Sequence, residues 1–176
     1  MKDNIGMERE LTISEGVSIS IHGDKVHVNG PKGSIERKII YPGIKLSINN
    51  NKVLISSKKS SRKFKRLIGT MESHIRNLIY GVIQGYTYKL KICSGHFPMK
   101  VTLSHSQVII SNFLGEKIPR KANIISDVNV KLDNDFLIVE GLDKEKTGQT
   151  AANIENATRI TNRDRRVFQD GIYMIK

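Results

Sequence analysis

The chain has 176 residues, with 29 lysines and arginines against 17 aspartates and glutamates, which gives a formal net charge of +12 at pH 7. Hydrophobic residues make up 38%, enough for a buried core, but no apolar run approaches the roughly 18 residues of a membrane-spanning helix. The charge favours a polyanion as partner (RNA, DNA or an anionic membrane face), while the charged first ten residues argue against a signal peptide and the single cysteine excludes an internal disulfide framework.

Alternating apolar residues predict two β-hairpins in the first half of the chain. The first spans residues 17–29 and turns at Gly23-Asp24, with valines and isoleucines on one face of each strand. The sequence Gly-Pro-Lys-Gly at residues 30–33 then breaks the strand, and a second hairpin follows over residues 46–55. The first half therefore begins as a small antiparallel sheet.

From Ser60 to Val82 the apolar period changes to that of an amphipathic helix. Ser60 or Ser61 can cap its start, and Glu72 and Arg76 can pair one turn apart. The apolar stripe consists of Phe64, Leu67, Ile68, Met71, Ile75, Leu78, Ile79 and Val82.

The densest run of positive charge lies at the start of this helix. Residues 58–66 hold six basic side chains and no acidic one. The positive end of a helix dipole disfavours cations, so this run conflicts with the helix that carries it. Two interpretations stay open: a solvated helix face, or a surface that meets an anionic partner, either RNA or a protein neighbour.

The same order of elements repeats in the second half. A hairpin is predicted over residues 101–111, a second over residues 130–139, and a weaker helix over residues 144–158. The spacing between the halves is the same at both ends of the strand-rich region, since Val17 corresponds to Val101 and Val53 to Leu137.

The repeat predicts a tandem duplication. The expected fold class is α+β, with two tandem duplicated domains, each a small mainly antiparallel sheet packed with one helix. The expected domains are residues 1–83 and residues 84–176.

No catalytic or metal site is predicted. Cys93 and His96 are three residues apart on an extended or turning segment, which does not place them as nucleophile and base, and no third group is indicated that would orient them. The histidines lack metal-ligand spacing. The Gly-Pro-Lys-Gly turn is no P-loop, although it could present backbone amides and Lys32 to a phosphate. We therefore expect no enzyme, no cofactor and no small-molecule substrate.

The closing segment, residues 159–176, is rich in arginine and neutral hydrogen-bonding side chains. Arginine offers a planar fork of five donors, and threonine, asparagine and glutamine contact sugar and backbone oxygens. Asp164 is expected to orient an arginine fork, while Phe168, Ile172 and Tyr173 hold the segment against its domain. Because the chain has no tryptophan and 6% aromatic residues, recognition of the RNA backbone is favoured over base stacking.

Four segments together resemble one protein family. They are the first hairpin with its Gly-Pro-Lys-Gly turn (residues 17–39), Gly-His-Phe-Pro-Met at 95–99, Asn-Phe-Leu-Gly-Glu-Lys at 112–117, and the arginine-rich string at 161–173. The resemblance is to the large-subunit ribosomal protein six family, in its archaeal and eukaryotic branch, and it runs from about Leu11 to Lys176. One departure is Gly95, where many members have a small non-glycine residue.

The resemblance implies a structural, cytoplasmic component of the large ribosomal subunit with no membrane association. It would contact ribosomal RNA near the sarcin–ricin loop and the factor-binding region, mainly through the second domain, with neighbouring ribosomal proteins beside it. An RNA-binding or RNA-chaperone module outside the ribosome is the alternative. The predicted RNA-binding residues come from the matched motifs and from the basic positions beside them. They are His96, Lys117, Arg120, Lys121, Arg159, Thr161, Asn162, Arg163, Arg165, Arg166 and Gln169.

Overall fold

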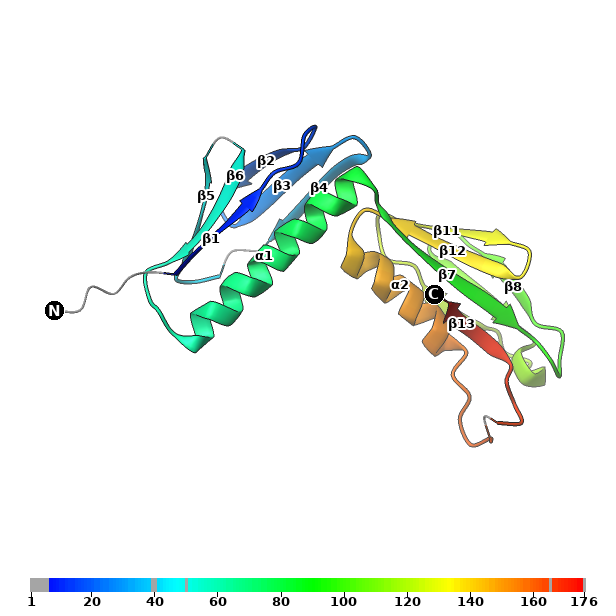
Figure 1. Ribbon diagram of the computed structural model, residues 1–176. Helices are drawn as coiled ribbons and strands as arrows, with labels where there is room; N and C mark the ends of the chain where they lie inside the picture. Colours follow the sequence, from blue (N-terminus) through cyan, green and yellow to red (C-terminus); the bar gives the residue numbers. More distant parts are fainter. Residues whose placement is uncertain (1–6, 39–40, 50, 165, 176) are drawn as a thin grey trace. The chain divides into compact units, whose positions relative to one another are not determined.

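The computed structural model describes residues 7–38, 41–49, 51–164 and 166–175, and the chain divides into two compact units, Met1–Gly85 and Tyr86–Lys176 (Figure 1). Within the described residues, neither helix is long and apolar enough to cross a membrane. Each unit has antiparallel sheets and one long helix, so the expected α+β class is confirmed.

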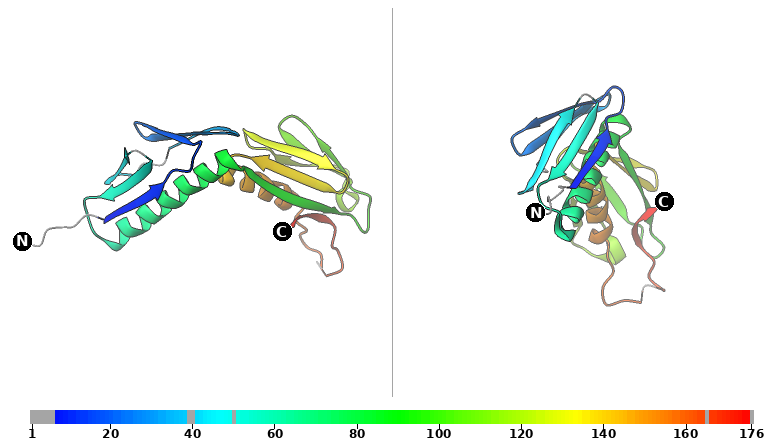
Figure 2. Two further views of the ribbon diagram at one scale, coloured as in Figure 1. Left: turned by 45° about the horizontal axis from the view of Figure 1, so that its top comes forward. Right: turned by 60° about the vertical axis from the view of Figure 1, so that its left-hand side comes forward.

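Unit 1 contains two three-stranded antiparallel sheets, one in the order β1-β6-β5 and the other in the order β2-β3-β4. Helix α1 packs against strands of both sheets and runs along β1 in both views of Figure 2. The elements are β1 (Met7–Thr12), β2 (Ser18–His22), β3 (Lys25–Gly30), β4 (Gly33–Lys38), β5 (Ile44–Asn49), β6 (Lys52–Ser57) and α1 (Arg62–Ile83).

The predicted helix is confirmed in position and in its buried face. Ser61 caps α1 by accepting a hydrogen bond from the backbone N–H of Phe64, and Arg76 donates to Glu72 at 2.6 Å. The strands supply inward-facing Val28 and Ile55, both fully buried, against which the helix packs. The buried side chains of the helix are Ile68, Met71, Ile75, Leu78, Ile79 and Val82.

The Gly-Pro-Lys-Gly turn joins β3 to β4 and closes on the end of α1. The backbone N–H of Lys32 donates to the carbonyl of Val82 at 2.9 Å, and its ammonium donates to the carbonyl of Gln84. These carbonyls belong to the last turn of the helix or follow it, where no intrahelical donor is available. The Lys32 amide and ammonium are thus engaged in capping the helix, which gives the turn a structural role in place of phosphate binding.

Unit 2 contains a four-stranded antiparallel sheet in the order β11-β12-β7-β13 and a three-stranded one in the order β10-β9-β8. Helix α2 packs on both, with Ala151 and Ile154 fully buried. The elements are β7 (Tyr86–Cys93), β8 (Lys100–Leu103), β9 (Gln107–Ser111), the 3-10 turn η1 (Phe113–Gly115), β10 (Arg120–Asn123), β11 (Val128–Asp133), β12 (Phe136–Gly141), α2 (Lys144–Ala157) and β13 (Gly171–Ile175).

The two units repeat the same topology, which confirms the internal duplication. The order β7-β12-β11 reproduces β1-β6-β5, and β8-β9-β10 reproduces β2-β3-β4. The β5–β6 and β11–β12 hairpins close at the equivalent pairs Asn49↔Lys52 and Asp133↔Phe136, so the expected correspondence of Val53 with Leu137 is confirmed.

In the first hairpin of each unit the expected correspondence of Val17 with Val101 is wrong. Val101 pairs with Ile110 in the same way that Ile19 pairs with Val28, so Ile19 is the structural counterpart of Val101. A shift of two positions along a strand preserves which side chains face inward, and the sequence pattern alone could not detect it.

Gly30 tests the contact between the β3–β4 turn and α1. A Cβ atom at this position would lie 2.6 Å from Cγ2 and 3.1 Å from the backbone oxygen of Val82. Because overpacking of this kind forces the backbone to shift, we expect Gly30→Ala to destabilise the protein by about 1–3 kcal/mol in chemical denaturation.

Gly69→Ala is the matched control for that substitution. A Cβ at Gly69, within α1, would meet nothing within 4 Å, and alanine favours helix more than glycine does. We expect this variant to be as stable as the wild type or more stable. Equal stability of the two variants would contradict the assigned role of Gly30.

Candidate nucleic-acid interface

Three loops of unit 2 carry most of the predicted RNA-binding residues. They follow β7 (residues 94–99), precede β10 (residues 112–119) and join α2 to β13 (residues 158–170). Figure 1 shows the last of these extending from the end of α2 to the start of β13. Side-chain contacts connect the three loops to one another.

A buried carboxylate joins the first and third loops. Asp170 is 3% exposed, and its side chain accepts hydrogen bonds from the backbone N–H of Gly95 and, at 3.2 Å, from that of His96. Its second oxygen lies 3.2 Å from Nδ1 of His96. Charge-assisted bonds of this kind offset the cost of burying the carboxylate. Gly95 suits this approach because an added Cβ would lie 3.3 Å from the Asp170 oxygen.

Phe168 brings His96 and Arg163 together. The rings of His96 and Phe168 stack with their centroids 5.0 Å apart and their planes inclined by 29°. The guanidinium carbon of Arg163 lies 4.9 Å from the centroid of Phe168. Aromatic stacking and a cation–π contact thus fix the position of the Arg163 side chain, while the residue remains exposed.

Asp164 orients Arg166, as expected for an acidic residue among arginines. Its carboxylate accepts from the Arg166 side chain at 2.8 Å and from the Arg166 backbone N–H at 2.9 Å. The side-chain hydrogen bond, followed by the backbone one, holds the pKa of Asp164 below its ordinary value. The Arg166 side chain is nevertheless 90% exposed, so the pair presents a guanidinium to solvent.

Arg120 connects the second and third loops. It donates to both oxygens of Glu116, at 2.8 and 2.6 Å, and to the carbonyls of Ala157 and Arg159, at 3.0 and 3.1 Å. Its guanidinium also lies 4.4 Å from the centroid of buried Phe113. These bonds engage most of its donors, and only 26% of its side chain is exposed. Arg120 is therefore built into the surface and holds its parts together.

The other predicted residues differ in their hydrogen bonds, backbone conformation and exposure. Gln169 donates to the carbonyl of Arg166 at 3.3 Å, and Asn162 adopts the left-handed conformation with φ of 59°. Arg165 lies outside the described residues. The exposed members of the set are His96, Lys117, Lys121, Arg159, Thr161, Asn162, Arg163, Arg166 and Gln169.

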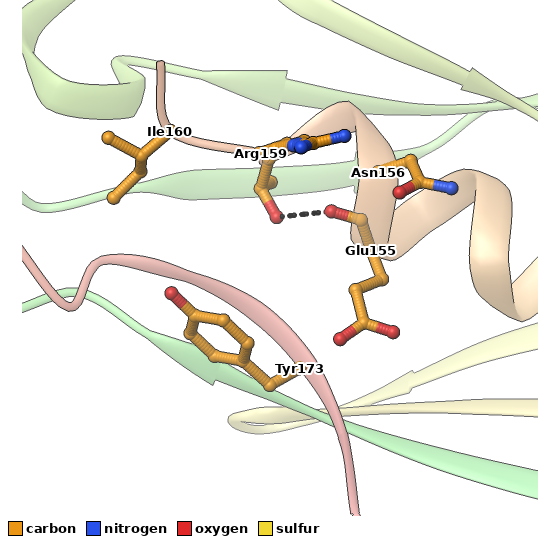
Figure 3. A pocket seen from close by; sticks show the side chains of 6 residues that line it. Glu155, Asn156, Arg159, Ile160 and Tyr173 are labelled. Atoms are coloured by element: carbon orange, nitrogen blue, oxygen red, sulfur yellow. Dashed lines mark hydrogen bonds between the residues drawn. The ribbon is translucent and has the colours of Figure 1, made fainter. Parts of the chain in front are cut away.

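Arg159 lines a hollow of about 190 Å³ between the end of α2 and β13 (Figure 3). Glu155 and Tyr173 also line it, so the hollow carries both signs of charge. Within the part of the chain that the structure describes, no group of three histidine, cysteine or acidic residues could hold a metal ion. The arrangement offers cations and hydrogen-bond donors at a surface.

Substitution of Asp170 tests whether its carboxylate holds the loops. In Asp170→Asn the negative charge is lost and one of the two acceptor oxygens becomes an amide donor, so the remaining hydrogen bonds from the backbone of residues 95–96 are no longer charge-assisted. We expect a loss of about 1–3 kcal/mol in unfolding free energy, measured by chemical denaturation. Asp133→Asn, at an exposed strand end, is the control and should leave the stability unchanged. Equal stability of both variants would contradict this role.

The bond between Arg120 and Glu116 predicts a pH dependence. Arg120, chiefly by hydrogen bonding, lowers the pKa of Glu116 from its ordinary value of 4.5. The stabilising effect of the pair is therefore fully present above pH 4.5 and is lost as the pH falls through the lower pKa of the folded state. An NMR titration should show the Glu116 pKa rising in Arg120→Gln. An unchanged pKa would exclude Arg120 as the cause.

Comparison with known proteins gives consistent matches. The family model described as "Ribosomal protein L6" matches residues 13–85 and 97–171. "Large ribosomal subunit protein uL6" of Methanospirillum hungatei is 44% identical over 169 residues, covering 96% of each chain. The protein of the same name from Methanosarcina mazei is 44% identical over 168 residues, with 96% of each chain covered, and that from Methanococcus vannielii 44% over 170 residues, covering 97% of this chain and 93% of its own.

These matches decide the family. The family model matches once in each half, in agreement with the duplicated topology, and these relatives are archaeal, in agreement with the branch inferred from the sequence. Ribosomal proteins of this family are structural parts of the ribosome in the cytoplasm, which confirms the expectation of a protein that is not an enzyme. The chain belongs to the ribosomal protein L6 family.

Proposed function

We propose that this protein is a structural component of the large ribosomal subunit that binds large-subunit ribosomal RNA mainly through unit 2. The names of its relatives assign them to the large subunit. The observation that carries the proposal is the ordered arginine loop: buried Asp170 and the contacts of Phe168 hold Arg163 at an exposed surface. The proposed location is near the sarcin–ricin loop and the factor-binding region, as the family resemblance implies.

Binding would depend on phosphate contacts. Arg163 and Arg166 would each neutralise a phosphate and release counterions, and Lys117 and Lys121 would add a second line of contacts. Since aromatic and carboxylate neighbours already orient the two guanidinium groups, little side-chain entropy is lost when they bind. Arg165 belongs to the same predicted set.

Neutral side chains of the arginine loop would add contacts to sugars and backbone oxygens. Thr161, Asn162 and Gln169 are exposed and carry hydroxyl or amide groups of the right kind. His96 and Arg120 would act chiefly by positioning, because both are engaged within the protein. We propose that this surface recognises the RNA backbone and its shape more than the base sequence.

An RNA chaperone outside the ribosome would share the same charge. Membership in a ribosomal protein family favours the ribosomal function. In the ribosomal function, neighbouring large-subunit proteins are proposed as further partners of this protein. Sedimentation of the tagged protein with large subunits at moderate salt supports the ribosomal assignment, whereas recovery of all of it in the free fractions would favour the alternative.

Substitution of Arg163 tests the RNA surface. We expect Arg163→Gln to lower the slope of log affinity against log salt by about 0.7–0.9, the value of one phosphate contact, in binding to protein-free large-subunit ribosomal RNA. Arg163→Lys keeps the charge and should keep most of the slope. Arg76→Gln removes the same charge from α1 and serves as the control. If the slopes of Arg163→Gln and Arg76→Gln are equal, Arg163 is not an RNA contact.

A further inference from the structure

A second concentration of positive charge lies in unit 1, at the start of α1. We define the α1 basic surface as Lys58, Lys59, Arg62, Lys63, Lys65 and Arg66, all of which are exposed. None of these side chains forms an ion pair with an acidic side chain in the described part of the chain. Glu8 lines the same shallow hollow as Lys65 and brings a negative charge near one edge of this surface.

The backbone that carries these cations is ordered. The buried hydroxyl of Ser57 donates to the carbonyl of Lys59 at 3.2 Å and accepts from its N–H at 3.3 Å. Ser61 then caps the helix, and the N–H of Lys65 donates to the Ser61 carbonyl at 3.0 Å. The cations therefore project from a fixed turn and the first turns of a helix, which reduces the entropy lost on binding.

The duplication provides an internal comparison. Helix α2 occupies the corresponding position in unit 2 and begins with acidic Asp143 as its cap and Glu145 in its first turn. The first turn of α1 has no acidic residue and carries basic ones in their place. Anions at a helix start are favourable and cations unfavourable. The first turn of α2 also holds Lys144 and Lys146, but Asp143 and Glu145 offset them, whereas no acidic residue of the first turn offsets the cations at the start of α1. An anion bound from outside would offset them.

We propose that the α1 basic surface is a second site for the phosphate backbone of RNA, separate from the arginine loop of unit 2. The inference rests on the proposed function and extends it to unit 1. The sequence alone left open whether residues 58–66 contact RNA or a neighbouring protein. The charge complementarity is direct, since six exposed cations lie within nine residues at a helix start, the end of a helix that favours anions.

The surface is better suited to RNA than to an acidic protein. Stable protein interfaces have an apolar core, often with aromatic anchors. Among the described residues of the 57–66 segment, no large hydrophobic side chain is exposed; Phe64 is half-buried beside Gly43. A site made of cations with no apolar centre matches a phosphate backbone.

The test uses the full chain with two triple variants. Lys58→Gln, Lys59→Gln and Lys63→Gln are combined in one, and Lys45→Gln, Lys91→Gln and Lys100→Gln, all at exposed strand positions, in the control. Both lose three charges. With protein-free large-subunit ribosomal RNA, we expect the first variant alone to lower the salt slope by about 2 and the affinity at least about tenfold near 0.1 M salt.

Stability gives a second, opposite readout. Because the substitutions remove cations from a helix start, the first variant should have a Tm about 2–4 °C higher than the control. Weaker RNA binding by a more stable protein excludes misfolding as the cause. Salt slopes that do not differ between the two triple variants would overturn the proposal.

Footprints separate this inference from the proposed function of unit 2. Hydroxyl-radical protection of the RNA should lose one set of nucleotides in the Lys58, Lys59 and Lys63 variant and a different set in Arg163→Gln. If Arg163→Gln alone changes the footprint, unit 1 does not bind RNA and the inference fails. If only the Lys58, Lys59 and Lys63 variant changes the footprint, the inference stands and the proposed RNA contact of Arg163 in unit 2 is excluded.

Discussion

The surface of unit 2 depends on one buried carboxylate. Asp170 accepts hydrogen bonds from Gly95 and His96, residues 75 and 74 positions away along the chain. A buried carboxylate is costly without donors, so separation of the two loops would destabilise the unit. Since β13 begins at the next residue and pairs with β7, this constraint also sets where the arginine loop ends.

The far end of the same loop is fixed independently. Thr158, at the end of α2, is buried and accepts from the backbone N–H of Ile172 at 2.9 Å, while Arg120 binds the carbonyls of Ala157 and Arg159. Near the end of the same loop, Phe168 stacks on His96. Arg163 and Arg166 therefore belong to a loop that is tied to its domain at both ends, in place of a loose charged tail.

The duplicated units show how one topology serves two purposes. In unit 1 only residues 31 and 32 separate β3 from β4, and this tight turn caps the end of α1. In unit 2 the equivalent connection, residues 112–119, is long enough to hold a 3-10 turn, Glu116 and Lys117. The sheets and helices keep their order because the core requires it, whereas connections and helix starts are free to change.

The sequence by itself determined the class of fold, the duplication and the two helices, because the spacing of apolar residues differs between helices and strands. It also determined the residue types of the proposed RNA surface. Strands β1, β4, β7, β10 and β13 were not predicted, although β7 lies inside the four-stranded sheet of unit 2. Only the tertiary structure decided three other features: the Asp170 carboxylate accepts a hydrogen bond from the backbone N–H of Gly95, Lys32 caps α1, and Ile19 is the counterpart of Val101. A period reports which face of an element is buried, and a shift of two positions leaves that face unchanged. A partner distant along the chain leaves no mark on local pattern, because the hydrogen bond forms only once both elements are folded.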